Sequence, residues 1–307
     1  MNTSRIWRAP ALFAVLHLAL PIGLAGQDVQ PRVYTPAPVG VNAVTLNYAF
    51  STGGLLFDKT VPVEDVIGDV HSLTPAYSRT LGVFGLAARA DIAVPFVIGD
   101  WTGDVDASGQ TTPSLASLRG FGDPTARFAL FLHGAPARRP EEFVRLRTGT
   151  VVGTTLRVRV PLGQYDADRL INLGSNRWAF SPQLGVSRIA ERFLFEAHAA
   201  VWFFTDNTAF LGTSTFSQKP LAVFQVHAAY RFREGIWFAM SSRQSLGGTT
   251  SADGGEFVNP ESNNRVGLTF GLGLSPRHSL RFVATTGLTA TKGNEYDTLS
   301  MAWSGVF

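Results

Sequence analysis

The sequence has no cysteine, few charged residues and, beyond residue 25, no long apolar run. Without cysteine, neither a disulfide framework nor a cysteine-based metal site can form. Charged residues make up 16% of the 307 residues, whereas about 25% is usual in soluble proteins. Because a membrane-spanning helix needs about 20 consecutive apolar residues, any passage of the chain beyond residue 25 through a membrane would have to use β-strands.

Sequence signatures of catalysis are also missing. There is no Gly-x-Ser-x-Gly nucleophile motif and no His-x-Glu zinc spacing. The glycine pairs at 53–54, 247–248 and 254–255 do not follow a strand and open a helix, so we expect loop glycines and not a phosphate-binding site. We therefore predict that the protein is not an enzyme and uses no cofactor and no metal ion.

Residues 1–25 have the pattern of a secretory signal peptide. Arg5 and Arg8 precede the apolar stretch 9–20, and small residues at positions 23 and 25 precede a cut before Gly26. The alternative, a membrane-anchor helix, would require a longer apolar run. Removal of the signal lowers the basic residues from 26 to 24 against 23 acidic ones, and a nearly neutral chain gives no indication of nucleic-acid binding.

The rest of the chain alternates apolar and polar residues at every second position. Near the middle of the chain, for example, Val158 and Val160 share one face, whereas Arg157 and Arg159 share the other. This two-residue period is typical of β-strands with one apolar face. Residues 26–41 contain several prolines and are predicted to form an extended periplasmic lead-in, ahead of a β-barrel at 42–307.

The alternating segments form about twelve strands of roughly ten residues, an even number and a length typical of outer-membrane barrels. Long connections are expected at 51–66, 99–121, 161–176, 205–219 and 247–263, and short turns near 81–85, 189–192, 233–235 and 275–278. The connection 134–147 is expected to contain a short helix. The sequence thus predicts an all-β fold, a transmembrane antiparallel up-and-down β-barrel. Its expected location is the bacterial outer membrane, which it would reach by export through the periplasm.

The C-terminal strand is predicted to close this barrel against the first strand, at 42–50. Pairing of the two would remove the exposed edges of the sheet. The terminal phenylalanine resembles the assembly signal of outer-membrane proteins, so outer-membrane lipid and the outer-membrane assembly machinery are expected partners. The face predicted to serve closure and assembly carries Leu299, Met301, Trp303 and Phe307.

The polar faces of the strands carry ionisable and amide side chains with an excess of arginine. In a barrel they would point into the lumen, because a charge facing lipid at mid-depth costs about 2–4 kcal/mol. One interpretation is a basic pathway that attracts anionic or polarisable solutes; the other is a network that braces the wall. The lumen-lining candidates are Arg89, Asp91, Arg127, Arg157, Arg159, Glu196, His198, Gln225, His227, Arg231, Arg243, Arg265 and Arg281.

Two of these candidates are histidines on consecutive long strands. Antiparallel pairing would bring His198 and His227 close to Glu196 or Gln225, and we expect both histidines to be hydrogen-bonding wall residues and not catalytic bases. A further set of aromatic residues is expected in the girdle at the membrane surface, with the entrances of the lumen as the alternative. This set comprises Tyr34, Tyr165, Trp178 and Trp202.

A resemblance to a known family is carried by five stretches, Tyr34–Gly40, Gly122–Pro124, Val160–Tyr165, Leu170–Phe180 and Asp297–Leu299. They resemble the outer-membrane transporter-like family named for the MetA pathway of phenol degradation, and the similarity extends over nearly all of the chain after the signal. The resemblance implies a β-barrel linked to the uptake or export of aromatic or other hydrophobic compounds. It implies no catalytic residues.

These observations favour an outer-membrane channel or transporter-like barrel for the passive passage of small aromatic or hydrophobic solutes. The alternative is a closed structural or interaction barrel without transport, because side chains can nearly fill a small barrel. An outer-membrane hydrolase that uses serine and histidine is a third hypothesis. The expected partner is a small-molecule solute and not a nucleic acid, and the sequence leaves the oligomeric state open.

Overall fold

A computed structural model describes residues 29–56, 63–107, 110–143, 149–258, 260–291 and 293–307. The predicted signal peptide, residues 1–25, lies outside the described residues. Helix α1 (Pro140–Phe143) is a single turn in the connection where a short helix was expected. In the described parts of the chain, no helix has the length and apolar character needed to cross a membrane.

The barrel wall is an antiparallel sheet of 14 strands, and it closes because β1 pairs with both β17 and β2. β3 and β4 are two halves of one spanning strand, and β5 and β6 are two halves of the next, so the wall has twelve spanning strands as predicted. The wall strands are β1 (Asn42–Leu56), β2 (Val63–Val83), β3 (Leu86–Ala93), β4 (Phe96–Ala107), β5 (Gln110–Phe121), β6 (Thr125–His133), β7 (Gly149–Arg159), β8 (Ala179–Ala190), β9 (Phe193–Phe204), β12 (Leu221–Arg233), β13 (Ile236–Gly247), β15 (Glu261–Gly273), β16 (His278–Thr289) and β17 (Gly293–Val306).

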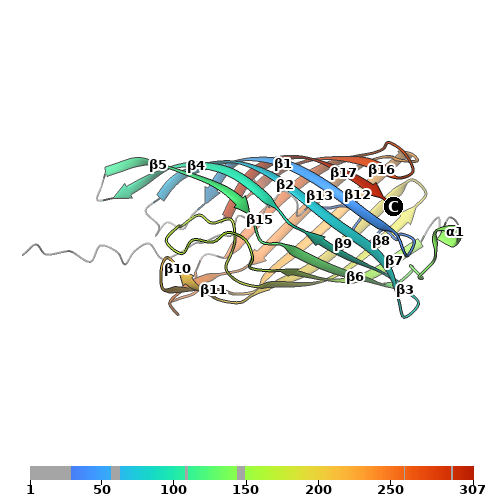
Figure 1. Cartoon of the computed structure of the whole chain (residues 1–307), viewed down its shortest axis with the longest axis horizontal. Coiled ribbons are helices and arrows are strands. Elements are labelled where there is room, and N and C mark those ends of the chain that lie inside the picture. The colour runs from blue at the N-terminus through green and yellow to red at the C-terminus, as the bar shows by residue number, and fades with distance from the viewer. Residues whose placement is uncertain (1–28, 57–62, 108–109, 144–148, 259, 292) are drawn as a thin grey trace, which may run out of the picture.

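The two ends of the barrel differ. Figure 1 shows the C-terminus and α1 at one end, which we call the C-terminal end, and β4, β5, β10 and β11 at the other, which we call the loop end. β10 (Asn207–Phe210), β11 (Ser214–Gln218) and β14 (Thr250–Ala252) form a separate three-stranded sheet. The expected long connections 205–219 and 247–263 therefore contain short strands of their own.

Alternation along the strands places polar side chains inside the barrel and apolar ones outside. β8 shows it most clearly: Gln183 and Ser187 are buried, whereas Leu184 and Val186 are 63% and 41% exposed. A water-soluble protein buries its apolar face, so the inverse pattern indicates an outer surface solvated by lipid. The prediction of an outer-membrane barrel from the sequence is confirmed.

The closing seam runs along the whole of β1 and β17. Phe50 lies opposite Leu299 in the register, and at the C-terminal end Asn42 and Phe307 exchange two backbone hydrogen bonds of 3.0 and 2.9 Å. On the inner side, the Thr45 hydroxyl lies 2.9 Å from that of Ser304. On the outer side, the predicted lipid-facing residues are exposed, namely Leu299, Met301, Trp303 and Phe307.

The alternation over residues 86–98 also predicts one continuous strand ahead of the expected loop 99–121, and both expectations were wrong. The strand is broken at Val94–Pro95, and Phe96–Ala107 and Gln110–Phe121 pair as the β4–β5 hairpin. The 21-residue β2 pairs with β3 through its C-terminal half and with β4 through its N-terminal half, and Pro75 lies at the change of partner. Because proline cannot donate a ladder hydrogen bond, it favours such a break. Polar composition suggested a loop, but pairing with β2 decides the conformation.

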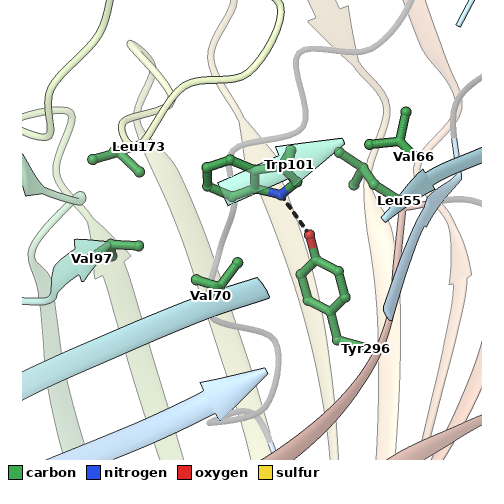
Figure 2. Packing of buried hydrophobic residues seen from close by; sticks show 7 residues of the cluster. All are labelled: Leu55, Val66, Val70, Val97, Trp101, Leu173 and Tyr296. Atoms are coloured by element: carbon green, nitrogen blue, oxygen red, sulfur yellow. Dashed lines mark hydrogen bonds between the residues drawn. The ribbon is translucent and has the colours of Figure 1, made fainter. Parts of the chain in front are cut away.

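An apolar cluster lies in the lumen at the loop end. Figure 2 shows the indole of Trp101 pointing to Tyr296, and its Nε1 donates a 2.9 Å hydrogen bond to the Tyr296 hydroxyl. The indole lies over Gly68 and Gly99, where a Cβ atom would be 2.4 and 2.2 Å from it. We call this the loop-end cluster; its buried members are Leu55, Val66, Val70, Val97, Trp101, Leu173 and Tyr296.

Deletion of Phe307 should impair insertion into the outer membrane, because it removes the terminal aromatic ring and both backbone hydrogen bonds to Asn42. The measurement is the fraction of heat-modifiable, folded barrel in isolated outer membranes. Phe307→Ala is the matched control, since it keeps the backbone bonds. If the ring serves assembly, both variants insert poorly in cells; normal insertion of the deletion variant would contradict the assignment.

Candidate functional site

The N-terminal segment, residues 29–41, lies inside the barrel. The sequence predicted an extended lead-in, but residues 31–34 form a turn, and Val29, Val33 and Tyr34 are buried against the inner wall. Val33 and Tyr34 pack with buried residues at the C-terminal end, including Phe131 and Val151. An apolar patch in the segment thus meets an apolar patch of the wall, which a segment outside the barrel would leave in water.

A carboxylate in the wall holds this segment. Glu196 on β9 accepts hydrogen bonds from the backbone N–H groups of Val33 and Tyr34 at 3.0 and 2.9 Å. The Ser187 hydroxyl donates to the Tyr34 carbonyl at 2.8 Å, and Gln183 Nε2 donates to the Tyr34 hydroxyl at 2.9 Å. The turn is therefore fixed through both its backbone and its side chain.

Two glycines make room for the Tyr34 ring. A Cβ atom added at Gly185 would lie 2.0 Å from the ring, and one at Gly153 would lie 2.7 Å from it. These glycines face the lumen on neighbouring strands and are paired in register. Their lack of a side chain creates the recess that Tyr34 fills.

A cavity of about 380 Å³ lies in the lumen next to this segment. Its lining includes residues 29–31 of the N-terminal segment, Val97 and Leu173 of the loop-end cluster, and the aromatic Trp202. Small residues of the closing strand, such as Ser300 and Ser304, leave the space open. The charged residues of the lining are Arg89, Asp91, Asp123, Arg127, Arg157, Arg159 and Arg281.

Charges in the cavity are organised around Asp91. Its carboxylate accepts hydrogen bonds from Nε of Arg127 at 2.8 Å and from Nε of Arg89 at 3.3 Å, and from the Ser78 hydroxyl. On the neighbouring wall, the guanidinium groups of Arg157 and Arg159 lie 5.6 and 5.4 Å from the centre of a Trp202 ring. One acidic group thus meets two of the arginines, and an aromatic face meets two others.

The remaining lumen candidates are distributed along the inner wall. Arg265 is buried and donates to the Thr285 hydroxyl and the Tyr296 carbonyl, and Arg243 donates to Ser245, which suits a bracing role. Arg231 is exposed at the C-terminal end, where it donates to the carbonyl of Glu191.

The two candidate histidines come together with Glu196 as the strand pairing suggested. In the register between β9 and β12, His227 lies opposite Glu196, and Gln225 lies opposite His198. The histidine ring centres are 5.3 Å apart, and all three ionisable residues are buried.

The loop between β7 and β8, residues 160–178, folds over the strand breaks at the loop end. Asp123, from the break between β5 and β6, accepts hydrogen bonds from the backbone N–H groups of Gly163 and Ser175 at 2.9 and 2.8 Å. Arg177 is buried, with its guanidinium 4.6 Å from the centre of the Phe204 ring, and this burial lowers the pKa of Arg177. Motifs that carry the family resemblance therefore anchor one another.

The model of the family described as "Putative MetA-pathway of phenol degradation" matches residues 58–303. The chain belongs to this family. Among solved structures it is similar to an outer membrane channel from Pseudomonas putida F1, at 20% identity and a TM-score of 0.74, over 91% of this chain and 100% of that one. The β-domain of the Bordetella autotransporter Brka is also similar, at 12% identity and a TM-score of 0.50, over 87% and 99% of the two chains. No curated protein matches the chain.

Three of the four aromatic residues expected in the girdle lie elsewhere. Trp178 is 42% exposed on the outside, and Tyr165 binds Ala209 and Asn207 in the loop-end connections. Tyr34 and Trp202 face the lumen. The signal for Trp202 was present, because it shares the alternation of Glu196 and His198; the recess for Tyr34 has no signature in the sequence.

Gly185→Ala should loosen the N-terminal segment. Its new Cβ atom would clash with the Tyr34 ring, and overpacking of this kind costs about 1–3 kcal/mol. We expect the amides of Val33 and Tyr34 to exchange with solvent about tenfold faster or more, as measured by hydrogen exchange and mass spectrometry. Gly54→Ala is the matched control, since nothing lies within 4 Å of its Cβ position. Equal exchange in the two variants would show that the glycine recess does not hold the segment.

Proposed function

We propose that the barrel is an outer-membrane channel for small aromatic or other hydrophobic solutes, and that its cavity favours solutes that carry an anionic group. The observation that carries the proposal is the lumen cavity of about 380 Å³, in which five arginines and Trp202 line one space. Binding sites for small molecules have volumes of about 300–1,000 Å³. The cavity is thus of a size suited to a single-ring solute.

The charge balance of this cavity favours anions. Asp91 is close to Arg89 and Arg127, and Asp91 and Asp123 are two negative charges against the five arginines that line the space. A guanidinium group presents a planar fork of donors that matches a carboxylate. Trp202 offers an aromatic face beside Arg157 and Arg159, so an aromatic acid can place its ring and its charge on neighbouring groups.

The apolar loop-end cluster favours the passage of hydrophobic solutes. Val97 and Leu173 belong both to this cluster and to the cavity lining, so an apolar surface continues into the arginine-lined space. The similar protein from Pseudomonas putida F1 is described as an outer membrane channel, and the family is named for phenol degradation. Both descriptions agree with passage of aromatic compounds through this barrel.

The N-terminal segment favours the alternative, a closed structural or interaction barrel. It occupies the lumen and is tied to Glu196 and Ser187. Conductance of Gly185→Ala separates the two functions, because loosening the segment opens a channel but leaves a filled interaction barrel without a path. Under the proposal, Gly185→Ala conducts more than the wild type in planar bilayers.

A hydrolase receives less support from the geometry. The Ser241 hydroxyl lies 2.7 Å from Nδ1 of His227, whereas Nε2 of His227 has no hydrogen-bond partner among the described residues. A serine–histidine–acid relay requires partners on both ring nitrogens. We therefore keep transport as the function, with residues 1–25 as a cleaved export signal and Phe307 as a contact of the assembly machinery.

Arg157→Ala and Arg159→Ala should reduce anion preference. Loss of one charge beside the path should lower the anion-to-cation permeability ratio by about fivefold, which corresponds to about 1 kcal/mol. The measurement is the reversal potential in a salt gradient, followed by liposome uptake of benzoate and of its neutral counterpart benzyl alcohol. Benzoate uptake should fall more than benzyl alcohol uptake.

Arg188→Ala is the control for these variants, because Arg188 is exposed and donates to Thr150 across the outer surface. It should leave selectivity unchanged. Should Arg157→Ala and Arg159→Ala destabilise the barrel without any change in selectivity, these arginines brace the wall. A barrel that passes neither ions nor either solute, in the wild type and in Gly185→Ala, contradicts the channel.

A further inference from the structure

Three buried side chains with metal-binding atoms meet in the wall behind the N-terminal segment. Glu196 and His198 lie on β9 and His227 on β12, and these residues are 3%, 7% and 3% exposed. His198 Nδ1 lies 4.0 Å from Glu196 Oε1. One ligand atom from each of the three lies within 4.8 Å of those of the other two. The proposed channel uses Glu196 to hold the segment but gives the two histidines no role.

Each histidine has one ring nitrogen with a hydrogen-bond partner and one without such a partner among the described residues. Nδ1 of His227 is 2.7 Å from the Ser241 hydroxyl, and His198 forms a side-chain hydrogen bond with Gln225. Nε2 of His227 and Nδ1 of His198 are buried without a hydrogen-bond partner among the described residues. Buried polar atoms without partners are rare, and each calls for a partner such as an ordered water molecule or an ion.

Glu196 adds a negative charge to this pair of nitrogens. Its carboxylate accepts the two N–H groups of Val33 and Tyr34, and two carboxylate oxygens have about four acceptor sites, so capacity remains. Burial of a carboxylate is costly unless a cation is close. In the described part of the chain, its ion-pair partner within 4.0 Å is His198, which is a cation only when protonated, and the charges of Arg89 and Arg32 act on it from farther away.

We propose that Glu196, His198 and His227 bind a divalent transition-metal ion of the zinc type through a carboxylate oxygen, Nδ1 of His198 and Nε2 of His227. Two imidazoles and one carboxylate suit zinc and its first-row neighbours, and three protein ligands leave a position for water. Ligand atoms around a tetrahedral zinc ion are about 3.4 Å apart, so ligand atoms that lie within 4.8 Å of one another must close by at most about 1.4 Å.

The residues around the three ligands already form the hydrogen bonds that usually orient metal ligands. Ligating histidines usually donate their second ring nitrogen to a fixed partner, and ligating carboxylates accept further hydrogen bonds. Ser241 and Gln225 support the histidines, and the Val33 and Tyr34 amides support Glu196. A bound ion would therefore share Glu196 with the N-terminal segment and couple metal binding to the position of that segment.

The test uses the untagged mature barrel, refolded in detergent once in metal-free buffer and once with Zn²⁺ or Co²⁺. Elemental analysis after dialysis should find a single ion per barrel. Co²⁺ should give visible absorption bands of a low-symmetry nitrogen–oxygen site, which disappear when Zn²⁺ is added. His198→Gln and His227→Gln should each weaken binding by at least about tenfold.

His71→Gln and His278→Gln are matched controls, because both histidines are exposed on the barrel surface beside Tyr48 and Trp303. They should bind the ion as the wild type does. The proposal is overturned if the wild type retains no ion under either refolding condition, or if binding is unchanged in both lumen variants. If the lumen variants do not fold, the wild-type Co²⁺ spectrum decides: bands that Zn²⁺ displaces support the site, and their absence rejects it.

Discussion

Closure of the backbone hydrogen-bond network is the constraint on which the rest of this structure depends. In a bilayer no water is available to unpaired N–H and C=O groups, so the first and last strands of a sheet that crosses it must pair with each other. Pairing of β1 with β17 along 14 residue pairs meets this requirement. Once the wall is closed, every second side chain faces a confined interior. The polar residues of the strands lie there because the outer surface contacts lipid.

Along its length, the interior has three parts: the N-terminal segment, the arginine-lined cavity and the loop-end cluster. At the C-terminal end, the N-terminal segment covers an apolar patch and is held by Glu196. The arginine-lined cavity follows, and Leu173 of the loop-end cluster borders it on the other side. Glu196 has a particular position in this arrangement, because one buried carboxylate serves both the segment that fills the lumen and the two histidines behind it.

The period-2 pattern was sufficient to predict the wall and its closure. That His198 and His227 lie close to Glu196 or Gln225 also followed from consecutive antiparallel strands, whereas the exact register came from the structure. Alternation reports which face a residue occupies, but it does not report the partner of a strand. The β4–β5 hairpin was missed for that reason, since its polar sequence becomes a strand only through pairing with β2.

The position of the N-terminal segment could not be predicted from local pattern either. Its prolines indicate an irregular chain, and they say nothing about where that chain lies. The recess for Tyr34 is formed by Gly153 and Gly185 on two different strands, and in the sequence these resemble any other strand glycines. Trp202 was different: it was expected in the girdle, although its place in the alternation, on the face of Glu196 and His198, indicates the lumen.

The breaks between β3 and β4 and between β5 and β6 make the structure of the loop end independent of the closure of the wall. Strand number and stagger fix the circumference of a barrel. Toward the C-terminal end, β3 and β6 continue the pairing from β2 to β7 and so complete the closed ring. The β4–β5 hairpin pairs with the wall through β4, and β5 stands at the end of the sheet order. Its length is therefore free of the closure condition. The hairpin can therefore be lengthened, shortened or exchanged by design without changing how many strands the barrel has or how they tilt.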